Sequence, residues 1–239
     1  MMSIKLFPAE NGDCIMLSIG KENQYNILID GGLSKTYQKY IKSEIQHIKE
    51  KRQKIGLLVC THMDNDHICG LIQVLKETNP DFIDNVWYNG FFQIVNSRFY
   101  SQKENCFTDR DNKILDEIIS QGVVSDSEQE IGINEGMSLG VLIEESKIPL
   151  NLVVEGRAIC SELVKNRYEI ATNIFITVLG PSKNNIIELE DHWKKDMVSR
   201  NYMFRVSDKI KLTKAFEYQW NVLNLYAPMK VLKFVRMKI

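Results

Sequence analysis

One short stretch, Cys60 to Gly70, constrains the fold and the chemistry of this chain more than any other. It reads Cys-Thr-His-Met-Asp-Asn-Asp-His-Ile-Cys-Gly and contains His62 and His67, two of the four histidines. A continuous apolar run at 55–60 precedes it, which is typical of a central strand buried on both faces. An amphipathic pattern from 67 to about 78 follows and predicts a helix. We therefore expect a strand to end, and a helix to begin, within this stretch.

The side chains of this stretch are those of a metal site. His62 and Asp64 lie two residues apart, so an extended backbone places both on one side. Asp66 and His67 follow at the turn into the helix, where Asp66 is also the expected N-cap. Imidazole and carboxylate together suit zinc, manganese or iron. Because four donors from one loop cannot easily encircle one ion, two metal ions would share them more naturally.

A metal pair of this kind can activate a water molecule and stabilise a leaving oxygen. Asp66 is our candidate for the residue that orients or deprotonates that water. The amides at the helix start carry partial positive charge, which favours an anionic substrate such as a phosphate ester. The alternative is an ordinary helix-capping loop with incidental histidines. Cys60 and Cys69 could add ligands, but we favour their burial as small hydrophobic residues.

Elsewhere the chain alternates strand and helix patterns, which predicts an α/β fold. Strands are expected at 3–8, 13–19, 26–32, 55–60, 85–88 and 173–179, and helices at 35–50, 67–78, around 114–119, 136–146 and 185–199, with an acidic, turn-like segment at 123–133. Asp13 and Asp30 lie at turns, where simple turn chemistry and a functional role stand as equal alternatives. His47 is expected next to the apolar face of its helix, and His192 on the solvated side of its helix. Neither is proposed as a ligand.

Composition places the chain among soluble globular proteins with one domain, with or without an insertion. It has 239 residues, of which 44% are hydrophobic, and a net charge of -1, so the overall balance indicates neither nucleic acid nor anionic membrane. No run approaches the roughly 18 apolar residues of a membrane span. Five cysteines without a CxxC pair, and no signal peptide, favour reduced thiols in the cytoplasm. The basic segment 209–239 is expected to be an ordinary terminal helix or strand, with a nucleic-acid patch as the weaker alternative.

The motif resembles that of the metallo-β-lactamase-fold superfamily, whose signature is a strand, His-x-His-x-Asp-His and a helix. Here the second histidine is replaced by Asp64, which is similar to the metallohydrolase domain of competence-type DNA-uptake proteins and their soluble relatives. Further agreement lies in four segments, residues 11–15, 28–32, 86–90 and 178–182. The resemblance implies an αββα sandwich, with His62 and Asp64 on one metal ion and Asp66 and His67 on a second.

The resemblance also implies an activity. It points to a hydrolase that uses a metal-bound hydroxide on an ester or phosphodiester-type substrate, either a small molecule or a nucleic-acid phosphoester. One or two zinc ions are the expected cofactor, with manganese as the other choice. The alternative is a catalytically incomplete protein, derived from this family, that binds metal or serves as an interaction module.

The later ligands of the family are missing from the sequence. No histidine lies between His67 and His192, and the C-terminal part contains neither a Gly-Asp nor a Ser-His-His-Gly segment. We therefore expect a metallo-β-lactamase-like domain at 1–200, looser and with an insertion at 91–170, followed by a divergent basic tail at 201–239. The second half of the sandwich is expected to be incomplete, through truncation or replacement, which would leave a sheet face exposed for oligomer formation.

Overall fold

A mixed five-stranded sheet forms the centre of the protein. The computed structural model describes residues 2–22, 24–95, 109–122, 138–164, 167–202, 208–226 and 235–238. The sheet contains, in spatial order, β1 (Met2–Leu6), β2 (Ile15–Ile19), β3 (Tyr25–Ile29), β4 (Ile55–Val59) and β5 (Val86–Trp87). Strands β1, β2 and β3 are antiparallel, whereas β3, β4 and β5 run parallel. The predicted α/β class is confirmed.

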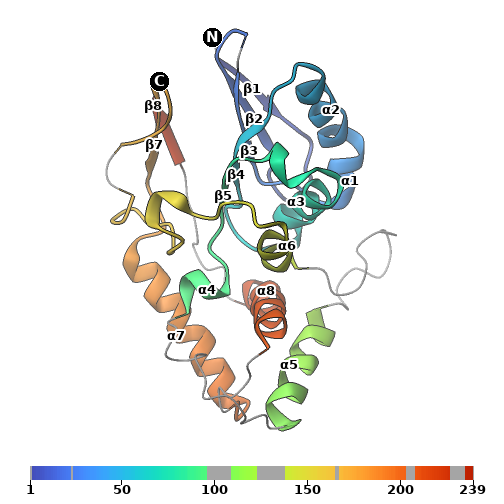
Figure 1. Cartoon of the computed structure of the whole chain (residues 1–239). Coiled ribbons are helices and arrows are strands. Elements are labelled where there is room, and N and C mark those ends of the chain that lie inside the picture. The colour runs from blue at the N-terminus through green and yellow to red at the C-terminus, as the bar shows by residue number, and fades with distance from the viewer. Residues whose placement is uncertain are drawn as a thin grey trace.

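Helices cover one face of this sheet (Figure 1). They are α1 (Ser34–Thr36), the π-helical turn η1 (Tyr37–Ile41), α2 (Lys42–Glu50) and α3 (Asn65–Glu77). The first three are continuous in sequence and correspond to the predicted helix at 35–50, although its π-helical turn was not predicted. The apolar stripe of this segment is buried against the sheet, since Tyr37, Ile41 and Ile45 share a core cluster with Leu28 and Leu58.

A second, three-stranded sheet covers the opposite face. It consists of β6 (Tyr168–Ala171), β7 (Ile174–Val178) and β8 (Val235–Lys238), all antiparallel. Its inward side chains share one apolar cluster with those of the first sheet: Leu17, Ile27, Leu57, Val59 and Trp87 lie on one side, and Ile174, Ile176 and Val178 on the other. The second sheet therefore covers, from β2 to β5, the face of the first sheet that was expected to be exposed.

Strand β1 remains outside this sandwich. All five of its residues are exposed, and Leu6 is 73% exposed. The register pairs Ile4 with Leu17, whose side chain packs against the second sheet. The apolar side chains of β1 therefore lie on the same face of the first sheet, but the second sheet does not cover them. An open apolar edge thus persists at β1, and oligomer formation through it stays a prediction.

Five further helices lie below the two sheets in the view of Figure 1. They are α4 (Phe91–Ile94), α5 (Asp109–Gly122), α6 (Leu139–Ser146), α7 (Lys183–Ser199) and α8 (Lys209–Tyr226), and two 3-10 turns, η2 (Pro80–Phe82) and η4 (Leu152–Val154), complete the described elements. Edge-on aromatic contacts hold the helices together, with ring centroids 5.1 Å apart for Phe91 and Trp193 and 5.6 Å apart for Phe91 and Phe216. Among the described residues, no helix is long and apolar enough to cross a membrane.

The C-terminal segment expected as a basic tail contributes both a helix and a strand. Helix α8 packs along α5, and β8 pairs with β7. The ordinary helix and strand expected there are therefore present, while the domain boundary at 200 stays a prediction. Strand β6 was not predicted, the helix at 136–146 begins at Leu139 after the N-cap Ser138, and the segment 123–133 lies outside the described residues.

Candidate metal centre

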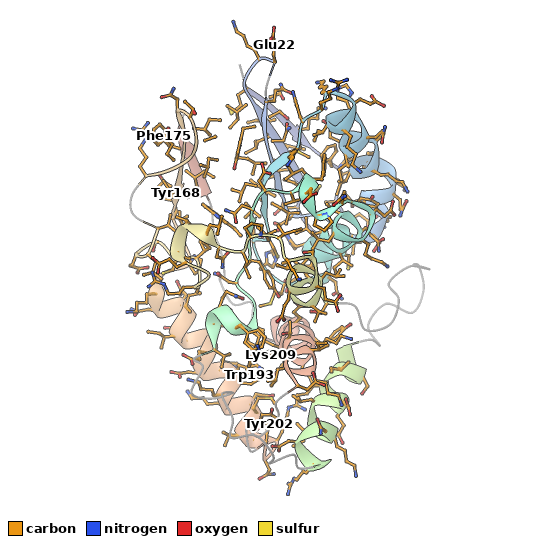
Figure 2. The ribbon with its side chains drawn as sticks, viewed as in Figure 1. Glu22, Tyr168, Phe175, Trp193, Tyr202 and Lys209 are labelled. Carbon is orange, nitrogen blue, oxygen red and sulfur yellow. The ribbon has the colours of Figure 1, made fainter. Side chains whose placement is uncertain are left out.

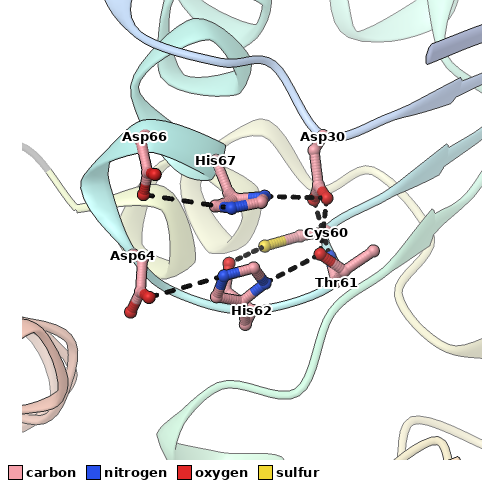
Figure 3. Close-up of polar contacts among 7 residues, drawn as sticks. All are labelled: Asp30, Cys60, Thr61, His62, Asp64, Asp66 and His67. Atoms are coloured by element: carbon pink, nitrogen blue, oxygen red, sulfur yellow. Dashed lines mark hydrogen bonds and ion pairs between the residues drawn. The ribbon is translucent and has the colours of Figure 1, made fainter. Parts of the chain in front are cut away.

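The candidate site forms where β3 and β4 end, beside the first turn of α3 (Figure 3). Because these strands are parallel, their carboxyl ends meet at the same edge of the sheet. Strand β3 leads into Asp30, and β4 leads into the motif loop, defined as residues 60–64, after which α3 (Asn65–Glu77) begins. The amide of Thr61 donates a hydrogen bond of 2.7 Å to Asp30 Oδ1. This bond joins the two strand ends, and with them the two halves of the site.

Close backbone contacts fix the start of α3 against the loop after β3. The amide of Gly31 donates to the carbonyl of His67 at 2.8 Å, and that of Gly70 donates to the carbonyl of Gly32 at 2.9 Å. A Cβ on Gly70 would lie 1.9 Å from the carbonyl oxygen of Gly31. Such a separation is far inside van der Waals contact, so the approach of helix to loop requires glycine. The position of His67 relative to β3 follows from this contact.

Helix α3 begins at Asn65, and its N-cap is Asp64. The prediction that Asp66 is the N-cap is therefore wrong, because Asp66 already lies in the first helical turn. Asp64 has an extended backbone, and its side chain does not cap the helix. It lies instead beside His62, with 3.4 Å between Asp64 Oδ2 and His62 Nε2. The extended backbone places these two side chains together, as their spacing predicted.

The four predicted site residues form two His–Asp pairs (Figure 3). His62 pairs with Asp64, and His67 lies beside Asp66, with 3.9 Å between His67 Nε2 and Asp66 Oδ1. The two imidazole ring centroids are 3.7 Å apart. The side chain of His67 is buried, whereas those of His62, Asp64 and Asp66 are partly exposed. Three of the four side chains are therefore accessible to solvent, while the role of these residues as metal ligands stays a prediction.

Asp30 is part of the site, a role that the sequence left undecided. It is fully buried, and its Oδ2 lies 3.0 Å from His67 Nδ1 and accepts a hydrogen bond from the Thr61 hydroxyl. Asp30, His62 and His67 each offer one ligand atom, and these atoms lie within 4.8 Å of one another. The strand before Asp30 and the two glycines after it were visible in the sequence, but not the pairing of β3 with β4.

Electrostatics at the site act most strongly on His67. Burial lowers the pKa of its imidazole, but the hydrogen bond to Asp30 and the charges of Asp30, Asp66 and Asp13 outweigh burial, so the pKa is raised. The thiol of Cys60 behaves differently, because burial raises its pKa well above the ordinary value. A protonated thiol is a poor metal ligand. Cys60 and Cys69 are both buried, as predicted.

A buried hydrogen-bond network supports the motif loop from behind. The hydroxyl of Tyr88, which follows β5, lies 3.5 Å from Met63 Sδ and donates to Glu217 of α8. Glu217 also accepts from the amides of Leu139 and Gly140, at 3.1 and 2.7 Å. Burial raises the pKa of this carboxyl group, although the four groups around it that donate hydrogen bonds oppose the change. Sequence reasoning missed Glu217, which connects α6 and α8 to the motif loop.

Fold and site together define an α/β protein of metallo-β-lactamase-like architecture, with a candidate metal centre where two parallel strands end. Residues 9–82 match the family model of the metallo-beta-lactamase superfamily. This segment contains Asp30 and the whole motif loop, so the similarity to that superfamily, whose members typically bind metal ions, covers the candidate site. The predicted resemblance is confirmed at this level, whereas the narrower one to competence-type proteins is not confirmed. No curated protein matches the chain.

Proposed function

We propose that this protein is a metal-dependent hydrolase that cleaves an ester or phosphodiester-type bond. One observation carries the proposal: two His–Asp pairs converge at the ends of β3 and β4, within the segment that matches the superfamily. Imidazole nitrogen with carboxylate oxygen is the donor set that zinc and manganese accept. The residues present therefore fit a divalent metal ion, or two of them.

The contacts suggest a role for each side chain. His62 and Asp64 would bind one ion, and Asp66 and His67 a second. Asp30 could be a ligand too, but both of its oxygens already accept hydrogen bonds from Thr61, and Oδ2 lies beside His67 Nδ1. A carboxylate on Nδ1 fixes the tautomer that leaves Nε2 available to the metal. We therefore assign Asp30 to orienting His67.

A bound divalent ion would supply Lewis acidity and a water molecule of lowered pKa. Asp66 has a partly exposed carboxylate beside the Nε2 atom of His67, so it can hold or accept the proton of an attacking water. The first turn of α3 contributes partial positive charge at the same place, which favours an anionic group on the substrate. A phosphoester, small or part of a nucleic acid, would satisfy this preference.

The experiment that tests the proposal is metal analysis combined with an activity assay. Purified protein loaded with zinc or manganese should retain one or two equivalents by mass spectrometry, and His67→Ala should lose most of this metal. His192→Ala is the matched control, since His192 is exposed on α7. Turnover of bis-p-nitrophenyl phosphate should require metal and disappear in His62→Ala. Equal, near-zero metal in wild type and His67→Ala would refute the proposal.

One observation favours a catalytically incomplete metal-binding protein as the second candidate. His192 follows the motif in the sequence and, like His47, is exposed on a helix. Neither belongs to the cluster of Asp30, His62 and His67. Stoichiometric metal binding that depends on His67, without turnover of any ester, would support this second function.

A further inference from the structure

A pocket of about 440 Å³ lies between α4, α6 and α8, outside the candidate metal centre. Its volume falls in the range of small-molecule sites, roughly 300 to 1,000 Å³. Six of the lining residues are aromatic or aliphatic, namely Tyr88, Phe91, Phe92, Ile143, Ile148 and Leu150. The interior therefore suits an apolar ring system better than a polar chain.

The floor of this pocket is held in place by the Glu217 network. The hydroxyl of Tyr88 donates to Glu217, so the aromatic ring of Tyr88 lines the pocket while its polar end is satisfied behind it. The amide of Gly140, a further lining residue, also donates to Glu217. Glu217 itself is not part of the lining. An apolar floor whose polar groups are already paired favours binding, because no such group must be desolvated without a partner.

The three charged residues of the lining, Glu144, Lys147 and Lys209, are exposed to solvent, and we call them the rim. Lys147 ends α6 and Lys209 begins α8, and within the described part of the chain neither forms an ion pair. Lys209 Nζ lies 5.7 Å from the ring centroid of Phe92, and Figure 2 shows Lys209 in the region between α4 and α8. Glu144 is the one acidic residue in the lining, so the rim carries a net charge of one positive unit.

We propose that this pocket binds a small aromatic molecule with one negative charge. The ring would lie against Phe92 and Leu150, which are partly exposed, and the anionic group would lie beside Lys147 and Lys209. The single positive excess matches a monoanion. The proposal does not depend on metal or on hydrolysis, since no residue of the candidate metal centre lines the pocket.

The test is calorimetric titration of the full chain with 2-naphthalenesulfonate, in EDTA so that metal does not contribute. The uncharged 2-naphthalenesulfonamide is the matched probe. We expect saturable binding of the sulfonate. The sulfonamide should bind about fivefold to tenfold more weakly, because it has no negative charge to pair with Lys147 and Lys209. The double variant Lys147→Gln/Lys209→Gln should weaken sulfonate binding by a similar factor and leave sulfonamide binding unchanged.

Two further variants make the result specific. Lys49→Gln is the control, because Lys49 Nζ lies 5.1 Å from the ring centroid of Phe82, a similar cation–ring contact on another part of the protein. Gln93→Trp places a large side chain in the pocket and should reduce binding of both probes, while circular dichroism verifies the fold. Absence of saturable binding, equal affinity for the two probes, or equal behaviour of Lys49→Gln and the double variant would overturn the proposal.

Discussion

Asp30 Oδ2 lies 3.0 Å from His67 Nδ1, although 37 residues separate the two in the sequence. The contact joins the end of β3 to the first turn of α3. It orients the imidazole, and it pairs a buried carboxylate with a basic group. Both the metal affinity of the site and its response to pH should depend on this relationship.

Replacing Asp30 by Asn should lower metal affinity by about 10- to 100-fold, the range for partners that orient a ligating histidine. The amide has the shape of the carboxylate but lacks the charge that strengthens the contact with Nδ1. Competition with a chromophoric chelator measures the dissociation constant for zinc. Asp84→Asn is the control, because Asp84 is exposed and forms an exposed ion pair with Lys54. Unchanged zinc affinity in Asp30→Asn would contradict the orienting role.

The stability of the metal-free protein should depend on His67 in a defined pH window. The pKa of His67 is raised above 6.5 in the folded protein, so the folded state binds this proton more tightly than the unfolded state. The stabilisation is therefore fully present below about pH 6.5 and is lost as pH rises through the raised pKa. The difference in unfolding free energy between wild type and His67→Gln, measured in urea, should fall with rising pH. A difference that grows with pH would have the wrong sign.

Gly70→Ala should destabilise the protein by about 1 to 3 kcal/mol, the usual cost of overpacking. Helix propensity alone predicts the opposite, a gain of about 1 kcal/mol. The clash decides the sign, because the added Cβ would lie 1.9 Å from the carbonyl oxygen of Gly31. Urea denaturation gives the value, and Lys76→Ala, at an exposed position of α3, should change stability by less than about 0.5 kcal/mol. A stabilised Gly70→Ala protein would show that the loop after β3 moves to accommodate the added methyl group.

Glu217→Ala should destabilise the protein by about 3 kcal/mol or more, because it removes the acceptor of the Tyr88 hydroxyl and of the Leu139 and Gly140 amides. Tyr88→Phe removes only one of these bonds and should cost about 1 kcal/mol. Unfolding free energies of both single variants and of the double variant form a double-mutant cycle. A measurable coupling energy is expected, since the two side chains are in direct contact. Additive effects would mean that the Tyr88–Glu217 bond contributes nothing of its own.

Much of the fold and of the motif could be predicted because the information is local. The apolar run at 55–60 and the helical periodicity after it depend on neighbouring residues, and so does the proximity of His62 to Asp64. The apolar stripes of the helices were also local, which is why the buried Leu189, Trp193 and Met197 of α7 agree with the prediction. Element boundaries were less certain, since cap geometry decides them, and the N-cap is Asp64 and not Asp66.

The sequence by itself thus determined the strand, the motif loop, the following helix and the types of ligand they offer. Only the tertiary structure decided which distant residues support them. Asp30 reaches His67 because β3 pairs in parallel with β4, and Glu217 reaches Tyr88 across 129 residues because α8 packs against α6. Strand β8, far from β7 in sequence, completes the second sheet. Such pairings depend on which surfaces fit together in the folded chain, and no local periodicity specifies them.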